Sequence, residues 1–119
     1  MRRTRALLVA VSAVNNAEER AIRMPEKFTS ELYEWSARAN WFFVDLPTEV
    51  SDRITAMPLI PGGFGSVKVE ATVGHVTWRT SVFPDDGRGT FVLPIKKEVR
   101  ARNGLTPGGP VDVTLEVLR

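Results

Sequence analysis

Two stretches of the chain alternate strictly between hydrophobic and polar side chains, which is typical of a β-strand with one buried face. They cover residues 67–73 and 111–117, and each follows a glycine-rich turn, at residues 61–66 and 104–110 respectively. The apolar positions are Val67, Val69, Ala71 and Val73 in the first stretch and Val111, Val113, Leu115 and Val117 in the second. Because each strand has a single apolar face, we expect a sheet with one side exposed to solvent.

The residues before these two strands also match each other. A short apolar strand at 41–46 ends at Pro47, and another at 90–93 ends at Pro94. Proline lacks the N–H that a β-ladder needs, but it is tolerated in the first turn of a helix. A short helix is therefore expected after each proline. Their apolar faces comprise Val50, Ile54 and Met57 in the first helix, and Ile95 and Val99 in the second.

Local signals mark the ends of these elements. Thr48 is the expected N-cap of the first helix, and Asn103 with Gly104 is the expected stop of the second. Gly74 and His75 form a two-residue loop that favours a type II′ hairpin, which leaves His75 at an exposed tip.

A longer strand precedes each unit, at residues 27–35 and 76–83, so the order strand, strand, helix, strand occurs twice. We therefore predict one mainly β domain over residues 24–119, built from two fused repeats that close into a single barrel with two short helices. The predicted core includes Val69, Ala71, Phe91, Leu93, Val99, Val113 and Leu115.

Composition excludes several kinds of chemistry. The 119 residues include no cysteine, so disulfides, zinc–thiolate sites and thiol catalysis are ruled out. Any histidine-based triad or metal site would have to use His75, the single histidine. The acidic pair Asp85-Asp86 stands between a proline and a glycine, which favours a turn. We predict no catalytic residue, no metal site and no cofactor.

The first 23 residues differ in character from the rest. They contain five arginines and two glutamates, so this segment carries +3 of a chain whose net charge is +2, which leaves residues 24–119 at about −1. Its apolar run is too short to span a bilayer. We expect residues 1–23 to be a mobile leader or a mis-assigned start ahead of Met24. A cleaved secretory signal and a helix docked on the domain are the alternatives.

The segment at residues 89–113 resembles the signature of swapped-hairpin domains of the AbrB, MazE and SpoVT type. It has a strand, Leu93-Pro94, a basic short helix, Gly104-Leu105, and Pro107-Gly108-Gly109 before the last strand. Gly109 replaces the aspartate that is usual there. Those relatives are dimeric double-split β-barrels that act as transcriptional regulators and toxin–antitoxin partners.

A wider resemblance covers nearly all of residues 25–119. The stretches at 27–32, 41–47, 78–84 and 86–87, together with the Leu93-Pro94 helix, resemble a bacterial family known as domain of unknown function nineteen-oh-five. This resemblance implies a double-split barrel in which one chain supplies both halves. It implies no established activity.

The two halves differ in charge, and this weighs against binding of duplex DNA. The second half offers Arg88, Lys96, Lys97, Arg100 and Arg102 against Glu98. The equivalent stretch of the first half has Asp45, Glu49 and Asp52 against Arg53. A two-fold DNA reader needs a basic surface in each half, and phosphate would be repelled by an acidic one. An AbrB-like regulator or an antitoxin-like protein is therefore the alternative function, and DNA is not an expected partner of residues 24–119.

We expect instead a non-catalytic binding module for a small ligand or a protein. The chain has many aromatic residues for a short barrel: Tyr33, Trp35, Trp41, Phe43, Trp78 and Phe83. They either pack at the barrel ends or line a cleft in which arginines hold an anion. The candidate ligand-binding residues are Trp78, Arg79, Lys96, Lys97 and Arg100. We expect a cytoplasmic monomer or weak dimer with no membrane partner.

Overall fold

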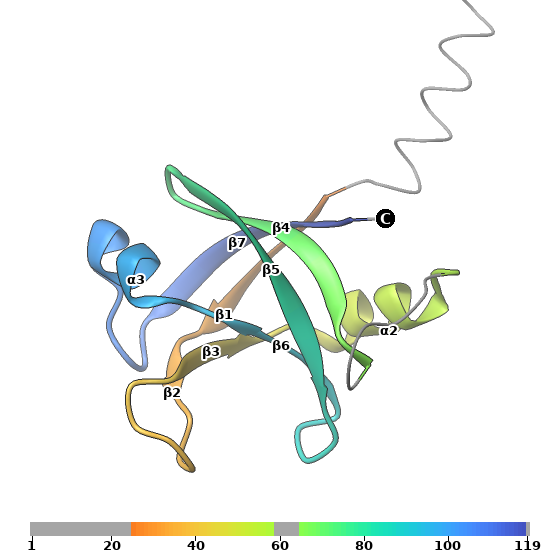
Figure 1. The fold of residues 1–119 in the computed structure, drawn as a ribbon, viewed down its shortest axis with the longest axis horizontal. Helices are drawn as coiled ribbons and strands as arrows, with labels where there is room; N and C mark the ends of the chain where they lie inside the picture. Colours follow the sequence, from red (N-terminus) through yellow and green to blue (C-terminus); the bar gives the residue numbers. More distant parts are fainter. Residues whose placement is uncertain (1–24, 59–64, 119) are drawn as a thin grey trace, which may run out of the picture.

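The computed structural model describes residues 25–58 and 65–118, in which seven strands and two helices enclose one hydrophobic core (Figure 1). The strands are β1 (Glu26–Glu31), β2 (Tyr33–Glu34), β3 (Phe42–Asp45), β4 (Val67–Val73), β5 (Val76–Asp85), β6 (Thr90–Pro94) and β7 (Pro110–Val117). The helices are α2 (Thr48–Ala56) and α3 (Lys97–Asn103).

The sheet nearly closes on itself because one segment of the chain forms both of its ends. The strand order is β1-β7-β4-β5-β6-β3-β2, and the two end strands are separated only by Leu32. The Leu32 N–H donates to the Gly109 carbonyl (3.0 Å), and the Leu32 carbonyl accepts the Gly108 N–H (2.8 Å). The junction between the two end strands is therefore held by the turn that precedes β7.

Strand β5 also bridges two partners. It pairs with β4 through residues 76–82 and with β6 through residues 83–85, as β1 pairs with β7 and β2 with β3. The remaining pairs, β3 with β6 and β4 with β7, join equivalent strands of the two halves. The predicted mainly β barrel with two helices is confirmed. The same set of strand pairs results when β1 and β2 are exchanged with β5, β3 with β6 and β4 with β7. This symmetry is consistent with two repeats in a double-split arrangement.

The core follows the alternation of the sequence. All four apolar positions of β4 and all four of β7 are buried, and every residue of the predicted core is at most 9% exposed. The buried faces of the helices are anchored by Val50 and Ile54 in α2 and by Val99 in α3. Met57, at the end of α2, is only partly buried against this core.

Helix α2 begins differently from the prediction. Thr48 is its first helical residue, and Pro47 occupies the N-cap position with no side-chain hydrogen bond to the helix. The prediction that Thr48 caps the helix is therefore wrong. Proline suits this place because its φ of −55° is already helical and the N–H that it lacks would have no partner in the first turn.

Helix α3 ends where the sequence predicts and is tied to a neighbouring hairpin. Gly104 adopts the left-handed conformation (φ 60°), which lets two backbone N–H groups bond the last carbonyls of the helix. The Asn103 amide donates to the Val73 carbonyl (3.2 Å), at the root of the β4–β5 hairpin. Gly74 leaves room for this contact, since a Cβ atom there would lie 2.0 Å from Asn103 Oδ1. His75 is exposed beside it.

Two expectations concern residues that the structure does not describe. They are those for residues 1–23 and for the glycine-rich residues 61–64. Within the described ranges, no helix is long and apolar enough to cross a membrane.

Replacing Leu115 by alanine tests the core. Leu115 is fully buried where β7 pairs with β4, so we expect Leu115→Ala to lower the free energy of unfolding by about 2–5 kcal/mol. The exposed Lys68 on β4 is the matched control, and Lys68→Ala is expected to change stability by under about 0.5 kcal/mol. Urea denaturation measures both values. A cost for Leu115→Ala near that of the control would place its side chain outside the core.

Candidate functional site

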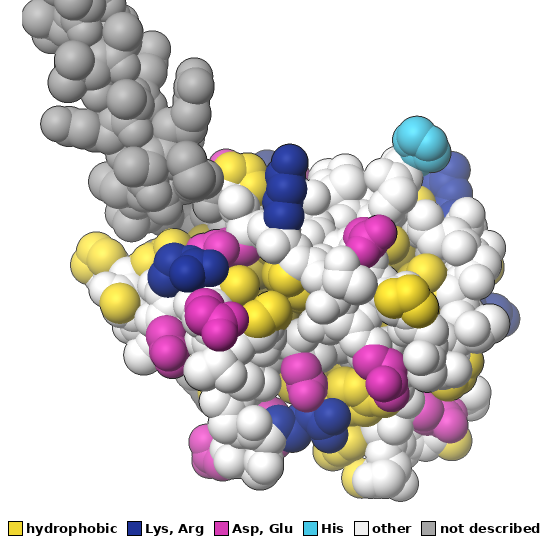
Figure 2. All heavy atoms as spheres, turned by 180° about the vertical axis from the view of Figure 1, so that it is seen from behind, with side chains coloured by type: hydrophobic (Ala, Val, Ile, Leu, Met, Phe, Trp, Pro, Cys, Tyr) yellow, Lys and Arg dark blue, Asp and Glu magenta, His cyan; other side chains and the backbone are white. Residues whose placement is uncertain are grey.

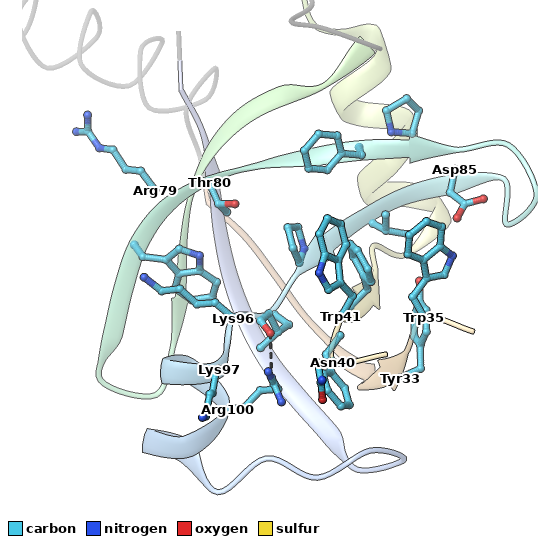
Figure 3. Close-up of a pocket in the computed structure, with 18 residues that line it drawn as sticks. Tyr33, Trp35, Asn40, Trp41, Arg79, Thr80, Asp85, Lys96, Lys97 and Arg100 are labelled. Carbon is cyan, nitrogen blue, oxygen red and sulfur yellow. Dashed lines mark hydrogen bonds between the residues drawn. The ribbon is translucent and has the colours of Figure 1, made fainter. Parts of the chain in front are cut away.

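An open groove of about 860 Å³ lies between helix α3 and the β2–β3 hairpin (Figure 3). Strands β2, β3, β5 and β6, the hairpin loop at residues 35–41, and residues 95–100 contribute to its wall. It contains all six aromatic residues that the sequence analysis singled out: Tyr33, Trp35, Trp41, Phe43, Trp78 and Phe83. The three tryptophans of the chain are therefore all in this groove.

The pairing of β3 with β6 brings the two sides of the groove together. Phe43 lies opposite Pro94, so the start of β3 is beside the end of β6. The Ile95 N–H donates to the Phe42 carbonyl (2.8 Å), which extends this contact to the residues that lead into α3. The hairpin loop that precedes β3 and the helix that follows β6 consequently face each other.

One wall of the groove is a cluster of aromatic rings. The centroids of Trp35 and Trp41 are 6.1 Å apart, and each lies 6.3 Å from the centroid of Phe43. The hairpin fixes this cluster, since the backbone N–H of Trp35 donates to the backbone carbonyl of Trp41 (2.7 Å). The chain can turn so tightly because Asn40 takes a positive φ (68°) and its N–H donates to the Glu34 carboxylate.

Large hydrophobic side chains are exposed at the groove. Trp35, Trp41 and Phe83 are 42%, 43% and 38% exposed, and they are the exposed large hydrophobic residues within the described ranges. All three line the groove. Apolar surface that a small protein gathers in one concave place is the usual character of a binding site.

The opposite wall is basic because of the helical spacing of its residues. Ile95 and Val99 are buried, which anchors this segment to the core. Lys96, Lys97 and Arg100 then lie along the face that borders the groove. This follows because residues three and four apart share one face of a helix.

Arg100 is the best-positioned of these cations. Its Nε donates to the Ile95 carbonyl (3.1 Å), and its guanidinium carbon lies 4.0 Å from the centroid of the Phe42 ring. These contacts leave the two terminal nitrogens of the guanidinium without a hydrogen bond to any described residue. Arg100 and Lys97 also have no carboxylate within 4.0 Å among the described residues, whereas Lys96 lies 3.9 Å from Glu98.

All five candidate ligand-binding residues border the groove, but the Arg79 side chain turns away from it. Trp78 is partly buried and packs against the core. Arg79 is its neighbour on β5, and successive side chains of a strand point to opposite faces. The Arg79 side chain is 76% exposed and lies 3.7 Å from Glu70, and Figure 3 shows it directed away from the other labelled side chains.

A second corner of the barrel has the same backbone framework but different side chains. The Leu46 N–H donates to the Phe91 carbonyl (2.9 Å), the counterpart of the bond from Ile95 to Phe42. Five residues after Leu46, in the position of Arg100, stands Ser51. It is buried, and its hydroxyl accepts the Phe91 N–H (3.0 Å). A tight turn at residues 86–89 replaces the aromatic loop there.

A hydrogen-bonded cluster holds Tyr33, which lines the groove. The Tyr33 hydroxyl donates to Asp45 Oδ1 (2.7 Å), and Arg88 Nε donates to both oxygens of the same carboxylate (2.8 and 2.9 Å). The Arg88 guanidinium also lies 4.0 Å from the centre of the Tyr33 ring. Burial, and then the bond to Asp45, raise the pKa of Tyr33 well above its ordinary value of 10.0. The bond to Asp45 likewise raises the pKa of Arg88.

Within the part of the chain that the structure describes, two hydroxyl-bearing side chains and no histidine line the groove. The hydroxyls in the groove wall belong to Tyr33, which is committed to Asp45, and Thr80. His75 is exposed at the β4–β5 hairpin and does not line the groove. Among the described residues, no three potential metal ligands converge. What the groove offers is aromatic surface, uncommitted positive charge and a few hydrogen-bonding groups.

Sequence reasoning missed part of this site. It found the aromatic residues and the basic helix, but it did not place Asn40, Thr80 or Asp85 in the same groove, nor Phe42 beneath Arg100. One signal was available for the loop. Trp35 and Trp41 flank five residues without a large hydrophobic side chain, which is the spacing of a hairpin whose two tryptophans meet at its root.

The comparisons with known proteins give a family and no activity. A family model described as a domain of unknown function (DUF1905) matches residues 28–115. No curated protein matches the chain.

The ionisation of Tyr33 tests the hydrogen-bonded cluster. Because the chain has one tyrosine, the near-ultraviolet absorbance of tyrosinate reports on Tyr33 alone. We expect its midpoint in the folded protein well above pH 10.0, and Asp45→Asn should move it downwards. Folding favours the protonated phenol, so its contribution to stability is complete below about pH 10 and is lost as the pH rises beyond that. A native midpoint at the ordinary value would contradict the observed contacts.

Proposed function

The chain belongs to the family described as a domain of unknown function (DUF1905), and we propose that in this member the groove binds a small, planar anion. One observation carries the proposal. The exposed rings of Trp35, Trp41 and Phe83 share a concave site with Lys97 and Arg100, two cations without a carboxylate partner among the described residues. The activity is binding, with no chemical step.

Each wall supplies a different part of the affinity. A flat ring that covers the exposed indoles removes apolar surface from water, which is worth roughly 25 cal/mol per Å². Aromatic pairs in offset or edge-to-face contact add about 0.5–1.5 kcal/mol. An anion at the other wall gains hydrogen bonds from the terminal nitrogens of Arg100, which Phe42 and Ile95 already hold in place. Pre-organisation of this kind lowers the entropic cost of binding.

The charge distribution favours a small anion over a polyanion. Residues 24–119 carry about −1 in total, and the face shown in Figure 2 has acidic side chains interspersed with few basic ones. Basic residues border the groove at one corner, whereas the counterpart of Arg100 at the second corner is the buried Ser51. This arrangement offers duplex DNA one basic contact region, whereas a two-fold symmetric DNA-binding protein needs two.

The alternative of an AbrB-like regulator or an antitoxin-like partner rests on the strand pairing and the basic helix alone. The small-ligand proposal also accounts for the exposed aromatic rings, which duplex binding would leave unused. A monomer or weak dimer and a cytoplasmic location are part of the same proposal.

Naphthyl phosphate is a simple probe of the proposed function. Its ring can lie on the tryptophans and its phosphate can reach Arg100, so we expect saturable quenching of tryptophan fluorescence. A hydrogen bond to a charged group contributes about 1.5–3 kcal/mol, so Arg100→Ala should weaken binding about tenfold or more. Trp41→Ala should weaken it to a similar degree.

Arg102→Ala is the matched control for charge. Arg102 belongs to the same helix but pairs with Glu98 (3.5 Å) and does not line the groove. We expect its affinity for naphthyl phosphate to match that of the wild type. Equal weakening by Arg100→Ala and Arg102→Ala would show a diffuse charge effect and would contradict binding in the groove. Thermal melts of each variant establish that the fold is retained.

Duplex DNA provides the test of the alternative. The full chain with Arg2, Arg3 and Arg5 replaced by glutamine removes the charge of the leader. We expect no tight, salt-sensitive binding, because the remaining basic residues can neutralise few phosphates. A titration at two salt concentrations measures this. Sub-micromolar affinity at physiological salt, lost in the Lys96→Ala/Lys97→Ala/Arg100→Ala variant, would make the regulator the better description.

A further inference from the structure

The groove has opposite charges at its two ends. Lys97 and Arg100 lie at one end, and the Asp85 carboxylate lies at the other, beyond Trp35 and Tyr33 (Figure 3). The aromatic rings stand between them. A ligand that fills the groove therefore meets a hydrogen-bond acceptor, then a stacking surface, then positive charge.

Asp85 is held in place but not neutralised. It is the last residue of β5, and its backbone carbonyl accepts the N–H groups of Arg88 (3.1 Å) and Gly89 (2.8 Å). Asp85 Oδ1 also accepts the Arg88 N–H (3.2 Å), whereas Oδ2 makes no hydrogen bond to a described residue. No cationic side chain in the described ranges lies within 4.0 Å of this carboxylate, because the Arg88 guanidinium is committed to Asp45.

We propose that the ligand is a mononucleotide whose base carries an amino group, which rests on the proposed function of the groove. The base would stack on Trp35 and Trp41, its amino group would donate to Asp85 Oδ2, and its phosphate would bind Lys97 and Arg100. Carboxylates accept hydrogen bonds from the amino groups of bases in this way. A simple aromatic anion offers no hydrogen-bond donor to Asp85, and the negative charge of the Asp85 carboxylate then repels the anion.

The arrangement of the rings favours a single nucleotide over a strand of nucleic acid. Trp35, Trp41 and Phe43 form one cluster with centroid separations of 6.1–6.3 Å, which offers one stacking platform and not a row of them. Proteins that bind single strands track the backbone with positive charge along a whole groove. Here Lys97 and Arg100 lie at one end of the groove only, and the other end carries the Asp85 carboxylate.

The test compares AMP with naphthyl phosphate, adenosine and inorganic phosphate on the full-length protein, using isothermal titration calorimetry. We expect AMP to bind at least about tenfold more tightly than naphthyl phosphate, because AMP offers an amino donor to Asp85 and naphthyl phosphate does not. Adenosine and inorganic phosphate, which each lack one of the two ends, should both bind more weakly than AMP.

Asp85→Asn removes the negative charge of Asp85 without removing the turn that this residue holds. Asparagine keeps an oxygen that can accept the Arg88 N–H, so the turn is preserved. We expect this variant to lose the preference for AMP while it binds naphthyl phosphate as well as the wild type or better. Asp86→Asn is the matched control, since it removes the same charge from the adjacent exposed residue, and it should keep the preference.

Each outcome points to one conclusion. If naphthyl phosphate binds and AMP is no tighter, or if Asp85→Asn keeps the preference, the nucleotide inference is overturned and the proposed function stands. If neither compound binds, both are overturned. If single-stranded oligonucleotides bind more tightly than AMP, with an affinity that grows with length, the ligand is a polymer and the inference is again overturned.

Discussion

The antiparallel contact between β3 and β6 is the interaction on which the rest of the structure depends. It joins the two halves of the chain at their second strands and is extended by two reciprocal hydrogen bonds, from Ile95 to Phe42 and from Leu46 to Phe91. Each of these bonds fixes the residues that lead into a helix. Without them, neither helix would have a defined position relative to the hairpin of the other half, and the groove would have no second wall.

The two corners created by this contact have become different. At one of them a seven-residue aromatic loop faces a helix with outward-facing cations, and at the other a tight turn faces a helix that presents the small, buried Ser51. One framework therefore carries different side chains at its two corners, and the exposed rings of Trp35 and Trp41 belong to the corner with the groove.

The sequence contained most of the fold and about half of the site. Strict alternation over residues 67–73 and 111–117 specified which side chains are buried, because alternate side chains of a strand point to the same face of the sheet.

The position of Thr48 was predicted wrongly because Pro47 occupies the N-cap, and the local sequence does not distinguish a proline N-cap from a polar one. Asp85 and Trp35 come from segments fifty residues apart, and the successive pairing of β5 with β6, β6 with β3 and β3 with β2 brings them into one groove. Arg79 illustrates the same limit, since its neighbour Trp78 borders the groove while its own guanidinium points away.

The most direct test of the account is to map where a ligand binds, by following the backbone amide resonances of the full-length protein during a titration with AMP or, should AMP not bind, naphthyl phosphate. We expect saturable shifts in residues 35–43, 78–80, 85 and 93–100, which include residues from both walls of the groove. Shifts confined to α2 and the turn at residues 86–89 would place the site at the second corner and contradict binding in the groove. Absence of any saturable shift with either compound would contradict binding of a planar anion altogether.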